Sequence, residues 1–332
     1  MNPGHPLSVV TTRFSSAVLF ATIASAAAAL DLQGHRGARG LAPENTLAAF
    51  KVALAVGVST LETDLALTRD GALVLSHEPY LNSALARGPD GHWLAADGAS
   101  IFSLSTSELA RYDVGRLNPA HKYAAQWPDQ KPVDGERIPA LRQLFDLARE
   151  ARSPGGRPVR FNIETKITPT SAETTPDAAR FASAVVSAVR AEGMSERVTI
   201  QSFDWRTLLQ VKAAAPELAT SCLTIESSAM NTVAPDATGA SPWHAGLRRS
   251  DHAGSVPRLA KAAGCSVWSP FWRNLSVESI AEAHRLGLKV IPWTINDAAE
   301  IGRAAALGVD GIITDYPDRA RRALSTQDIA ID

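Results

Sequence analysis

Short apolar runs alternate with amphipathic stretches along most of the chain, and a glycine marks many of the junctions. The junctions read LAVGVSTLETD (54–64), AKAAGCSVWSP (260–270), AHRLGLKVIPWT (283–294) and AAALGVDGIITD (304–315). Because glycine adopts the left-handed backbone that ends many helices, each junction predicts a helix followed by a strand. Helix starts are predicted at Asn45 or Thr46, at Ser276 and at Asn296, whose side chains are typical N-caps. Alternating strands and helices predict a mostly parallel sheet that is buried on both faces.

The apolar runs predict nine strands, at 30–34, 59–67, 73–77, 160–166, 197–202, 219–225, 265–269, 288–294 and 310–314. Only the residues RDG separate the second run from the third, which is too short for a parallel crossover but suits a hairpin. If Asp70 and Gly71 are the two turn residues, Asp64 lies opposite His77. Eight strands then remain for an α/β fold of the TIM type, a (β/α)₈ barrel with a hairpin after its second strand. An open doubly wound sheet would need G-x-G-x-x-G after the first strand, and GHRGARG does not fit that pattern.

Residues 78–137 interrupt the strand–helix repeat. This stretch is rich in Gly, Pro and Asp and predicts one short helix near 105–111. Insertions of this length are usually functional, so we expect a lid or a cap that shapes the substrate site. A second irregular stretch, 227–256, is expected over the same end of the barrel.

Composition and termini bound the class of protein. The 332 residues are 45% apolar and 20% charged, and 33 basic against 34 acidic residues give a net charge of −1, which argues against a nucleic-acid partner. Residues 1–29 carry Arg13, a short apolar run and small residues, the pattern of a cleaved signal peptide, which predicts a periplasmic or secreted protein. The run is too short for stable membrane insertion, so residues 30–332 are expected to form the barrel domain. The composition says nothing of the oligomeric state.

The chain has two cysteines, Cys222 and Cys265. Both fall in or beside predicted strands, so a disulfide bond between them is possible in an oxidising compartment. Two unpaired, buried cysteines are the favoured interpretation.

Polar or aromatic residues follow many of the apolar runs. They are His35 and Arg36, Glu62 and Asp64, Glu164 and Lys166, then Gln201, Trp293 and Asp315. In a (β/α)₈ barrel the carboxyl ends of the strands form the active-site rim, so these residues are expected to meet there.

The residue types at this rim indicate phosphate chemistry. Glu62 and Asp64 lie two apart on one strand and so share a face, and Glu164 would complete a trio of carboxylates. Carboxylates this close repel each other and have raised pKa values unless a hard divalent cation is bound among them. Arg36 and Lys166 beside such a cation would hold a phosphate-type anion. His35 and His77 would flank the phosphoester as general acid and general base.

The sequence resembles the glycerophosphodiester phosphodiesterase family. The matching segments are HRGARGLAPENT (35–46), LETDLALTRDGALVLSHEP (61–79), IPALRQLFDLA (138–148), NIETK (162–166), QSFD (201–204), PWTIN (292–296) and DGIITDYPD (310–318). The resemblance implies a metal-dependent barrel enzyme that hydrolyses small glycerophosphodiesters, such as glycerophosphocholine, to sn-glycerol 3-phosphate and an alcohol. It implies that His35 and His77 are the acid–base pair and that Trp293 and Phe203 line the glycerol side. It also implies that Arg36 and Lys166 hold the phosphate. The ligands of Ca²⁺ or Mg²⁺ would be Glu62, Asp64 and Glu164. Glu78 after His77 departs from the family's usual aspartate.

Two other functions remain open. A related phosphodiesterase of the phospholipase C or D type would act on lipid or lysolipid and expose an apolar rim, for which Trp93, Tyr112, Tyr123 and Trp127 are candidates. A noncatalytic ligand-binding barrel would lack a histidine or a metal carboxylate, and none is missing.

Overall fold

The computed structural model describes residues 1–2, 4 and 29–332. The predicted signal peptide therefore lies almost entirely outside the described residues. The strands are β1 (Asp31–Gly34), β2 (Thr60–Leu67), β3 (Leu73–Leu75), β4 (Arg160–Thr165), β5 (Val198–Ser202), β6 (Ala219–Thr224), β7 (Val267–Pro270), β8 (Lys289–Val290) and β9 (Gly311–Thr314). The helices are α1 (Leu47–Val56), α2 (Thr106–Leu109), α3 (Leu141–Ala148), α4 (Ala178–Ala191), α5 (Trp205–Ala214), α6 (Val256–Ala262), α7 (Val277–Arg285), α8 (Ala298–Ala306) and α9 (Pro317–Ser325).

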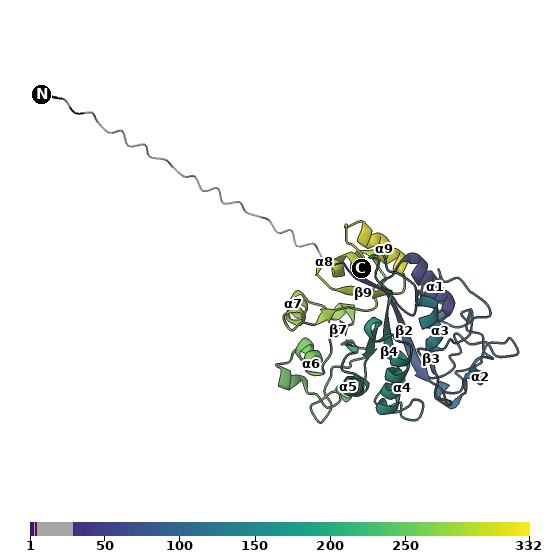
Figure 1. The fold of residues 1–332 in the computed structure, drawn as a ribbon. Helices are drawn as coiled ribbons and strands as arrows, with labels where there is room; N and C mark the ends of the chain where they lie inside the picture. The colour runs from purple at the N-terminus through teal and green to yellow at the C-terminus, as the bar shows by residue number, and fades with distance from the viewer. Residues whose placement is uncertain (3, 5–28) are drawn as a thin grey trace.

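Eight of the strands form a nearly closed parallel barrel. Their order is β8-β7-β6-β5-β4-β2-β1-β9, and β3 pairs with β2 outside this path. Hydrogen bonds from Asp310 N to Val290 O (2.9 Å) and from Ile313 N to Pro292 O (3.0 Å) join the two ends of the path. Figure 1 shows α1 and α3 to α9 following one another around the sheet. The predicted (β/α)₈ barrel is confirmed.

Local sequence explains where the helices begin and end. Thr46 caps α1 by accepting a hydrogen bond from Ala49 N, and Gly57 ends this helix with φ 87°. The predicted cap at Ser276 is confirmed for α7. The prediction of Asn296 for α8 was wrong by one residue, because the Asp297 carboxylate accepts from the first-turn amides.

The hairpin exists, but its predicted register was wrong by one residue. Leu65 pairs with Leu75, and Ser76 rather than His77 lies opposite Asp64. The turn contains three residues, because Thr68 N bonds to Ala72 O (2.9 Å) and leaves 69–71 in the loop. Gly71, with φ 83°, supplies the left-handed position that three-residue hairpin loops favour.

The inserted segment 78–137 packs against this hairpin. Its Leu81, Ile101 and Leu109 form a small core with Ala66 of β2 and Val74 of β3. The predicted short helix is α2, which is capped by Ser105. In Figure 1 the segment lies to one side of the barrel, beyond β3 and around α2. It adds a separate apolar layer that the barrel alone would not have.

The two cysteines form a disulfide bond, and the favoured interpretation of unpaired cysteines was wrong. Cys222 and Cys265 are joined with an S–S distance of 2.05 Å. Cys222 lies on β6, and Cys265 lies two residues before β7, the neighbour of β6 in the sheet. Both side chains are buried. The apolar residues around them in the sequence indicated this burial but not the disulfide bond.

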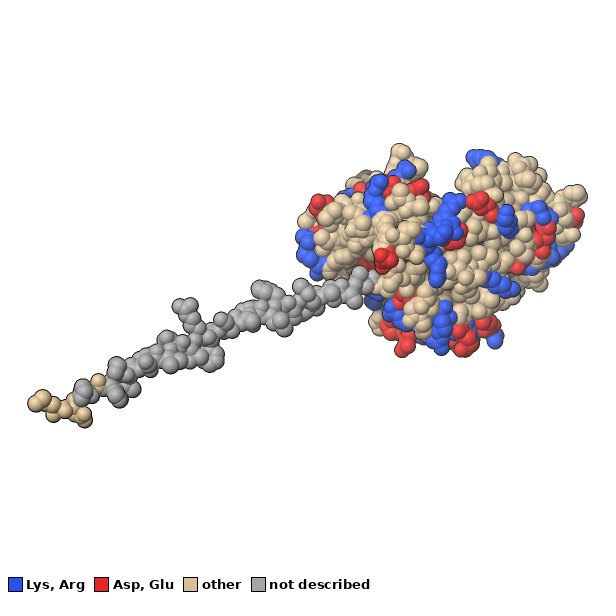
Figure 2. All heavy atoms as spheres, turned by 90° about the horizontal axis from the view of Figure 1, so that it is seen from above, with Lys and Arg blue, Asp and Glu red and all other residues tan. Residues whose placement is uncertain are grey.

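Surface charge and helix hydrophobicity bear on what the protein contacts. Figure 2 shows basic and acidic side chains mixed over the face in view. Within residues 29–332, and in the few described before them, no helix has both the length and the apolar character required to cross a bilayer.

Candidate active site

Three carboxylates meet at the carboxyl end of the barrel. Glu62 and Asp64 come from β2 and Glu164 from β4, where Asp64 pairs directly with Glu164. One oxygen of each lies within 4.8 Å of the others, and all three side chains are buried. The Asp64 Oδ1 atom is buried without a hydrogen-bond partner. A buried anionic oxygen of this kind is costly unless something positive binds it.

The protonation equilibria reflect this crowding. Burial, reinforced by the charge of Asp64, raises the pKa of Glu62 well above its usual value. Burial also raises the pKa of Glu164 to about 7, although Lys166 opposes the effect. Burial acts the same way on Asp64, but Arg36, His77 and Lys166 together more than offset it and hold the pKa of this carboxyl low. Burial and crowding therefore oppose ionisation of Glu62 and Glu164 in the metal-free protein, and a divalent cation with oxygen ligands would favour the ionised trio.

Amide side chains fix the positions of the carboxylates. Gln201 Nε2 donates to Glu62 Oε1 (2.7 Å), and Asn162 Nδ2 donates to Gln201 Oε1 (2.9 Å) inside the barrel. Asn45 Nδ2 donates to Asp64 Oδ2 (2.9 Å). Asn45, which the sequence suggested only as a helix cap, has φ 53° and turns its side chain towards β2. These bonds leave one Asp64 oxygen free for a ligand.

Arg36 and Lys166 lie where the sequence predicted. The Arg36 backbone N donates to Glu62 Oε2 (2.8 Å), and its guanidinium pairs with Glu44 (2.7 Å) and Asp64 (3.2 Å). Lys166 Nζ donates to Glu164 Oε1 (2.8 Å). Both cations line the pocket above the trio. Their charges make this pocket suitable for an anion beside the carboxylates.

His35 is oriented by a buried aspartate that follows β9. Its Nδ1 lies 2.6 Å from Asp315 Oδ1, and its Nε2 lies 3.9 Å from Glu62 Oε2. Burial would raise the pKa of Asp315, but Arg39 and His35 hold it well below its usual range, so the carboxylate is ionised. Burial, together with Arg39, lowers the pKa of His35 despite Asp315. A neutral imidazole that donates through Nδ1 presents Nε2 to the pocket as a base.

His77 reaches the same pocket although its predicted register was wrong. It lies two residues beyond the end of β3, with Nδ1 2.7 Å from Glu78 Oε1. Burial and the charges of Arg36 and Lys166 lower the pKa of His77 to about 4. His35 and His77 therefore both line one pocket with Glu62 and Glu164.

Aromatic side chains form another wall of this pocket of about 160 Å³. The rings of Phe203 and Trp293 lie 5.2 Å apart at 86°, and Trp293 Nε1 donates to Ser269 O (2.9 Å). Trp243, from the irregular stretch 227–256, packs against Phe203 at 6.3 Å. The structure thus brings both predicted aromatic residues to the site and adds Trp243 beside them.

Sequence reasoning missed residues that hold the site together. Asp315 was noted as a residue at a strand end but was given no function, and Arg39 and Glu44 were not singled out. Arg39 donates to both oxygens of Asp315 (2.8 and 3.1 Å). Tyr123, from the inserted segment, donates to Glu44 and accepts from Arg39. The spacing His35-x₃-Arg39 was the only available signal, and on its own it is weak.

Barrel and site together define a class, the (β/α)₈-barrel hydrolases with histidines, cations and a carboxylate cluster at the carboxyl rim. Comparison with known proteins gives the family. The model of the glycerophosphoryl diester phosphodiesterase family matches residues 35–319. The chain belongs to this family.

Individual relatives are similar to this chain over most of their length. The glycerophosphodiester phosphodiesterase of Caldanaerobacter subterraneus subsp. tengcongensis is 30% identical over 86% of this chain and 93% of its own. A solved structure from Silicibacter pomeroyi, assigned to glycerophosphoryl diester phosphodiesterases, is 33% identical, with a TM-score of 0.79 over 92% of this chain and 96% of that one. A phosphodiesterase of Oleispira antarctica, solved with the product sn-glycerol-3-phosphate, is 22% identical with a TM-score of 0.64 over 90% and 97%. This last likeness shows the fold.

Proposed function

We propose that the protein hydrolyses glycerophosphodiesters, such as glycerophosphocholine, to sn-glycerol 3-phosphate and an alcohol, and that it requires Ca²⁺ or Mg²⁺. The observation that carries the proposal is one pocket lined by two histidines, two cations and the Glu62 and Glu164 carboxylates, which form a buried trio with Asp64. The family and the activity of the Caldanaerobacter relative support it.

Each group has a chemical task in this reaction. Glu62, Asp64 and Glu164 would hold the cation, which when bound supplies positive charge to the phosphoryl oxygens. Arg36 and Lys166 bind and orient the phosphate. One histidine takes a proton from the attacking hydroxyl, and the other gives a proton to the leaving alcohol oxygen.

The attacking group is either water or the glycerol hydroxyl next to the phosphoester. If the hydroxyl attacks, a cyclic phosphate forms and a substrate without that hydroxyl is not hydrolysed. Equal rates for glycerophosphocholine and its 2-deoxy analogue would exclude this route and leave direct attack by water.

Assaying the purified mature protein on a panel of glycerophosphodiesters tests the proposal. We expect release of sn-glycerol 3-phosphate, loss of activity after EDTA treatment and dialysis, and recovery with Ca²⁺ or Mg²⁺. Full activity after exhaustive chelation would overturn the metal requirement, and no turnover of any diester would overturn the proposed function.

The structure gives less support to an enzyme acting on lipid. Trp93, Tyr112, Tyr123 and Trp127, the candidates for an apolar rim, are all half-buried or buried. Trp127 stacks under Arg39 at 4.2 Å, and Tyr123 bonds to Glu44. Tyr123 and Trp127 thus pack the inserted segment onto the barrel, and Trp93 packs against Arg87 within the segment.

We propose that the mature protein is exported, with its N-terminus near Leu30 or Asp31. The motive is the signal-peptide pattern of residues 1–29, and the Cys222–Cys265 disulfide bond suits an oxidising compartment. N-terminal sequencing of the exported protein tests this, and a sequence beginning at Met1 would contradict it.

A further inference from the structure

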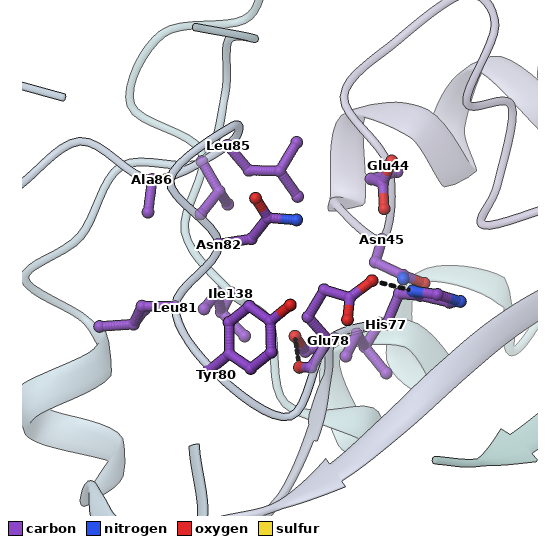
Figure 3. A pocket seen from close by; sticks show the side chains of 13 residues that line it. Glu44, Asn45, His77, Glu78, Tyr80, Leu81, Asn82, Leu85, Ala86 and Ile138 are labelled. Carbon is purple, nitrogen blue, oxygen red and sulfur yellow. Dashed lines mark hydrogen bonds and ion pairs between the residues drawn. The ribbon is translucent and has the colours of Figure 1, made fainter. Parts of the chain in front are cut away.

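Tyr123 connects the inserted segment to the phosphate-binding side of the pocket. Its hydroxyl donates to Glu44 Oε2, and Glu44 Oε1 accepts from the Arg36 guanidinium (2.7 Å). Glu44 lies just before α1, beside Asn45, and lines a small cavity next to His77 (Figure 3). A chain of two hydrogen bonds thus joins the insert to one of the two cations that are proposed to bind the phosphate.

Both bonds of this chain involve a buried charge. Arg36 and Glu44 are each 7% exposed. Burial would raise the pKa of Glu44, but the nearby charges, chiefly Arg36 and Arg39, more than offset it and keep the carboxyl ionised. Burial and the charge of Glu44 raise the pKa of Tyr123, so its hydroxyl keeps the proton that it donates. Each oxygen of Glu44 therefore has a donor.

Contacts with its neighbours hold the Tyr123 ring against the barrel. The ring meets Trp127 edge-on with centroids 5.9 Å apart, and Trp127 lies under the Arg39 guanidinium at 4.2 Å. Gln130 Nε2 donates to Arg39 O (2.8 Å). Because these contacts do not involve the Tyr123 hydroxyl, Tyr123→Phe should remove the hydrogen bonds of that hydroxyl and leave the ring in place.

The Tyr123 hydroxyl matters to Arg36 because Glu44 is shared between them. Without the hydroxyl, Glu44 Oε2 would be buried without a donor, which is costly. The carboxylate would turn to find another donor, and the guanidinium that it anchors would move with it. Arginine binds phosphate through hydrogen bonds of fixed geometry, so a small rotation of Arg36 weakens that contact.

We propose that Tyr123 is a positioning residue for the substrate phosphate, which acts by fixing Glu44 and, through Glu44, the Arg36 guanidinium. The inference rests on the proposed function, because that function places the phosphate against Arg36. The contact between arginine and phosphate exists in the bound substrate as well as in the transition state. Its loss therefore weakens binding of phosphate ligands more than it slows the chemical step.

The second bond of the Tyr123 hydroxyl leads towards His35 but should matter less. Arg39 Nη1 donates to this hydroxyl over 3.2 Å. Arg39 also donates to both oxygens of Asp315, which orients His35. Those bonds remain when the hydroxyl is removed, so the orientation of the histidine and kcat should change little.

Tyr123→Phe, with Ca²⁺ or Mg²⁺ present, tests this role. We expect the Kd of sn-glycerol 3-phosphate, measured by titration calorimetry, to rise about tenfold, a typical effect of one hydrogen bond to a charged group. The KM of the glycerophosphodiester substrate should rise by a similar factor, and kcat should stay within about threefold of the wild type. General loosening of the insert would not produce this separation of KM from kcat.

Tyr112→Phe is the matched control. Tyr112 belongs to the same inserted segment, packs against its small core and does not line the pocket. The control should keep the wild-type Kd. In a Glu44→Ala background, Tyr123→Phe should raise the Kd no further, because the residue through which Tyr123 acts is gone.

Three results would overturn this inference and leave the proposed function standing. They are an unchanged Kd in Tyr123→Phe, an equal rise in Tyr112→Phe, and a second tenfold rise in the Glu44→Ala background. The first two comparisons decide the matter even where Glu44→Ala does not fold. Failure of the wild type to hydrolyse any glycerophosphodiester would overturn the proposed function itself.

Discussion

Replacement of Glu164 by glutamine should make the metal-free protein more stable at high pH. The Glu164 carboxyl is buried beside Asp64, and its pKa is raised from 4.5 to about 7. The folded state therefore retains a proton between these two pH values, where the unfolded state has already released it. The free energy of unfolding of the wild type falls over this interval by roughly 3 kcal/mol and stays lower above it. Glutamine has no such proton and keeps an acceptor for Lys166.

Urea unfolding in EDTA at pH 4.5 and pH 8.5 measures this effect. The stability of Glu164→Gln relative to the wild type should rise by about 3 kcal/mol between the two pH values. The lowered pKa values of His35 and His77 act in the opposite direction, since the unfolded state binds protons that the folded state does not. Both proteins share these histidines, so the difference between them isolates Glu164.

Two further measurements make the result decisive. Glu150→Gln, at an exposed position just beyond α3, should show no gain with pH. Ca²⁺ or Mg²⁺ at about 100 times its Kd should stabilise the wild type at pH 8.5 by roughly 2.7 kcal/mol, and Glu164→Gln by much less at the same concentration. A stability difference between Glu164→Gln and the wild type that is the same at both pH values would refute the argument that burial raises the pKa of Glu164.

Other variants test the site and the fold. His35→Ala and His77→Ala should each lower kcat by roughly 10²–10⁴-fold with little change in thermal stability, and the double variant should be far from additive; near-normal kcat in either would exclude the two-histidine mechanism. Asp315→Asn should lower kcat more than it changes KM, because the amide no longer fixes the His35 tautomer; an unchanged kcat would remove this positioning role. Cys222→Ala/Cys265→Ala should lose about 4 kcal/mol in urea unfolding, since the disulfide bond spans 43 residues; equal stability of the variant and the oxidised wild type would contradict this.

The sequence alone determined the barrel and most of its site. Hydrophobic periodicity and helix-ending glycines are local features of the sequence. The strands could therefore be located without knowledge of tertiary contacts. The carboxyl ends of parallel barrel strands meet at one rim whatever the details of packing. His35, Glu62, Glu164 and Lys166 could therefore be predicted to meet.

The tertiary structure alone decided how these residues are held and what lies beside them. Asp315 contacts His35 although 280 positions separate them in the sequence. No local sequence pattern predicts a contact between residues so far apart. The hairpin register depended on whether Thr68 pairs with Ala72, which makes a three-residue loop of 69–71. The residues RDG are also compatible with the predicted two-residue turn. The disulfide bond and the cavity beside His77 likewise arise from packing between separate elements. Local patterns specify each element, whereas the contacts between elements depend on the positions of all of them together.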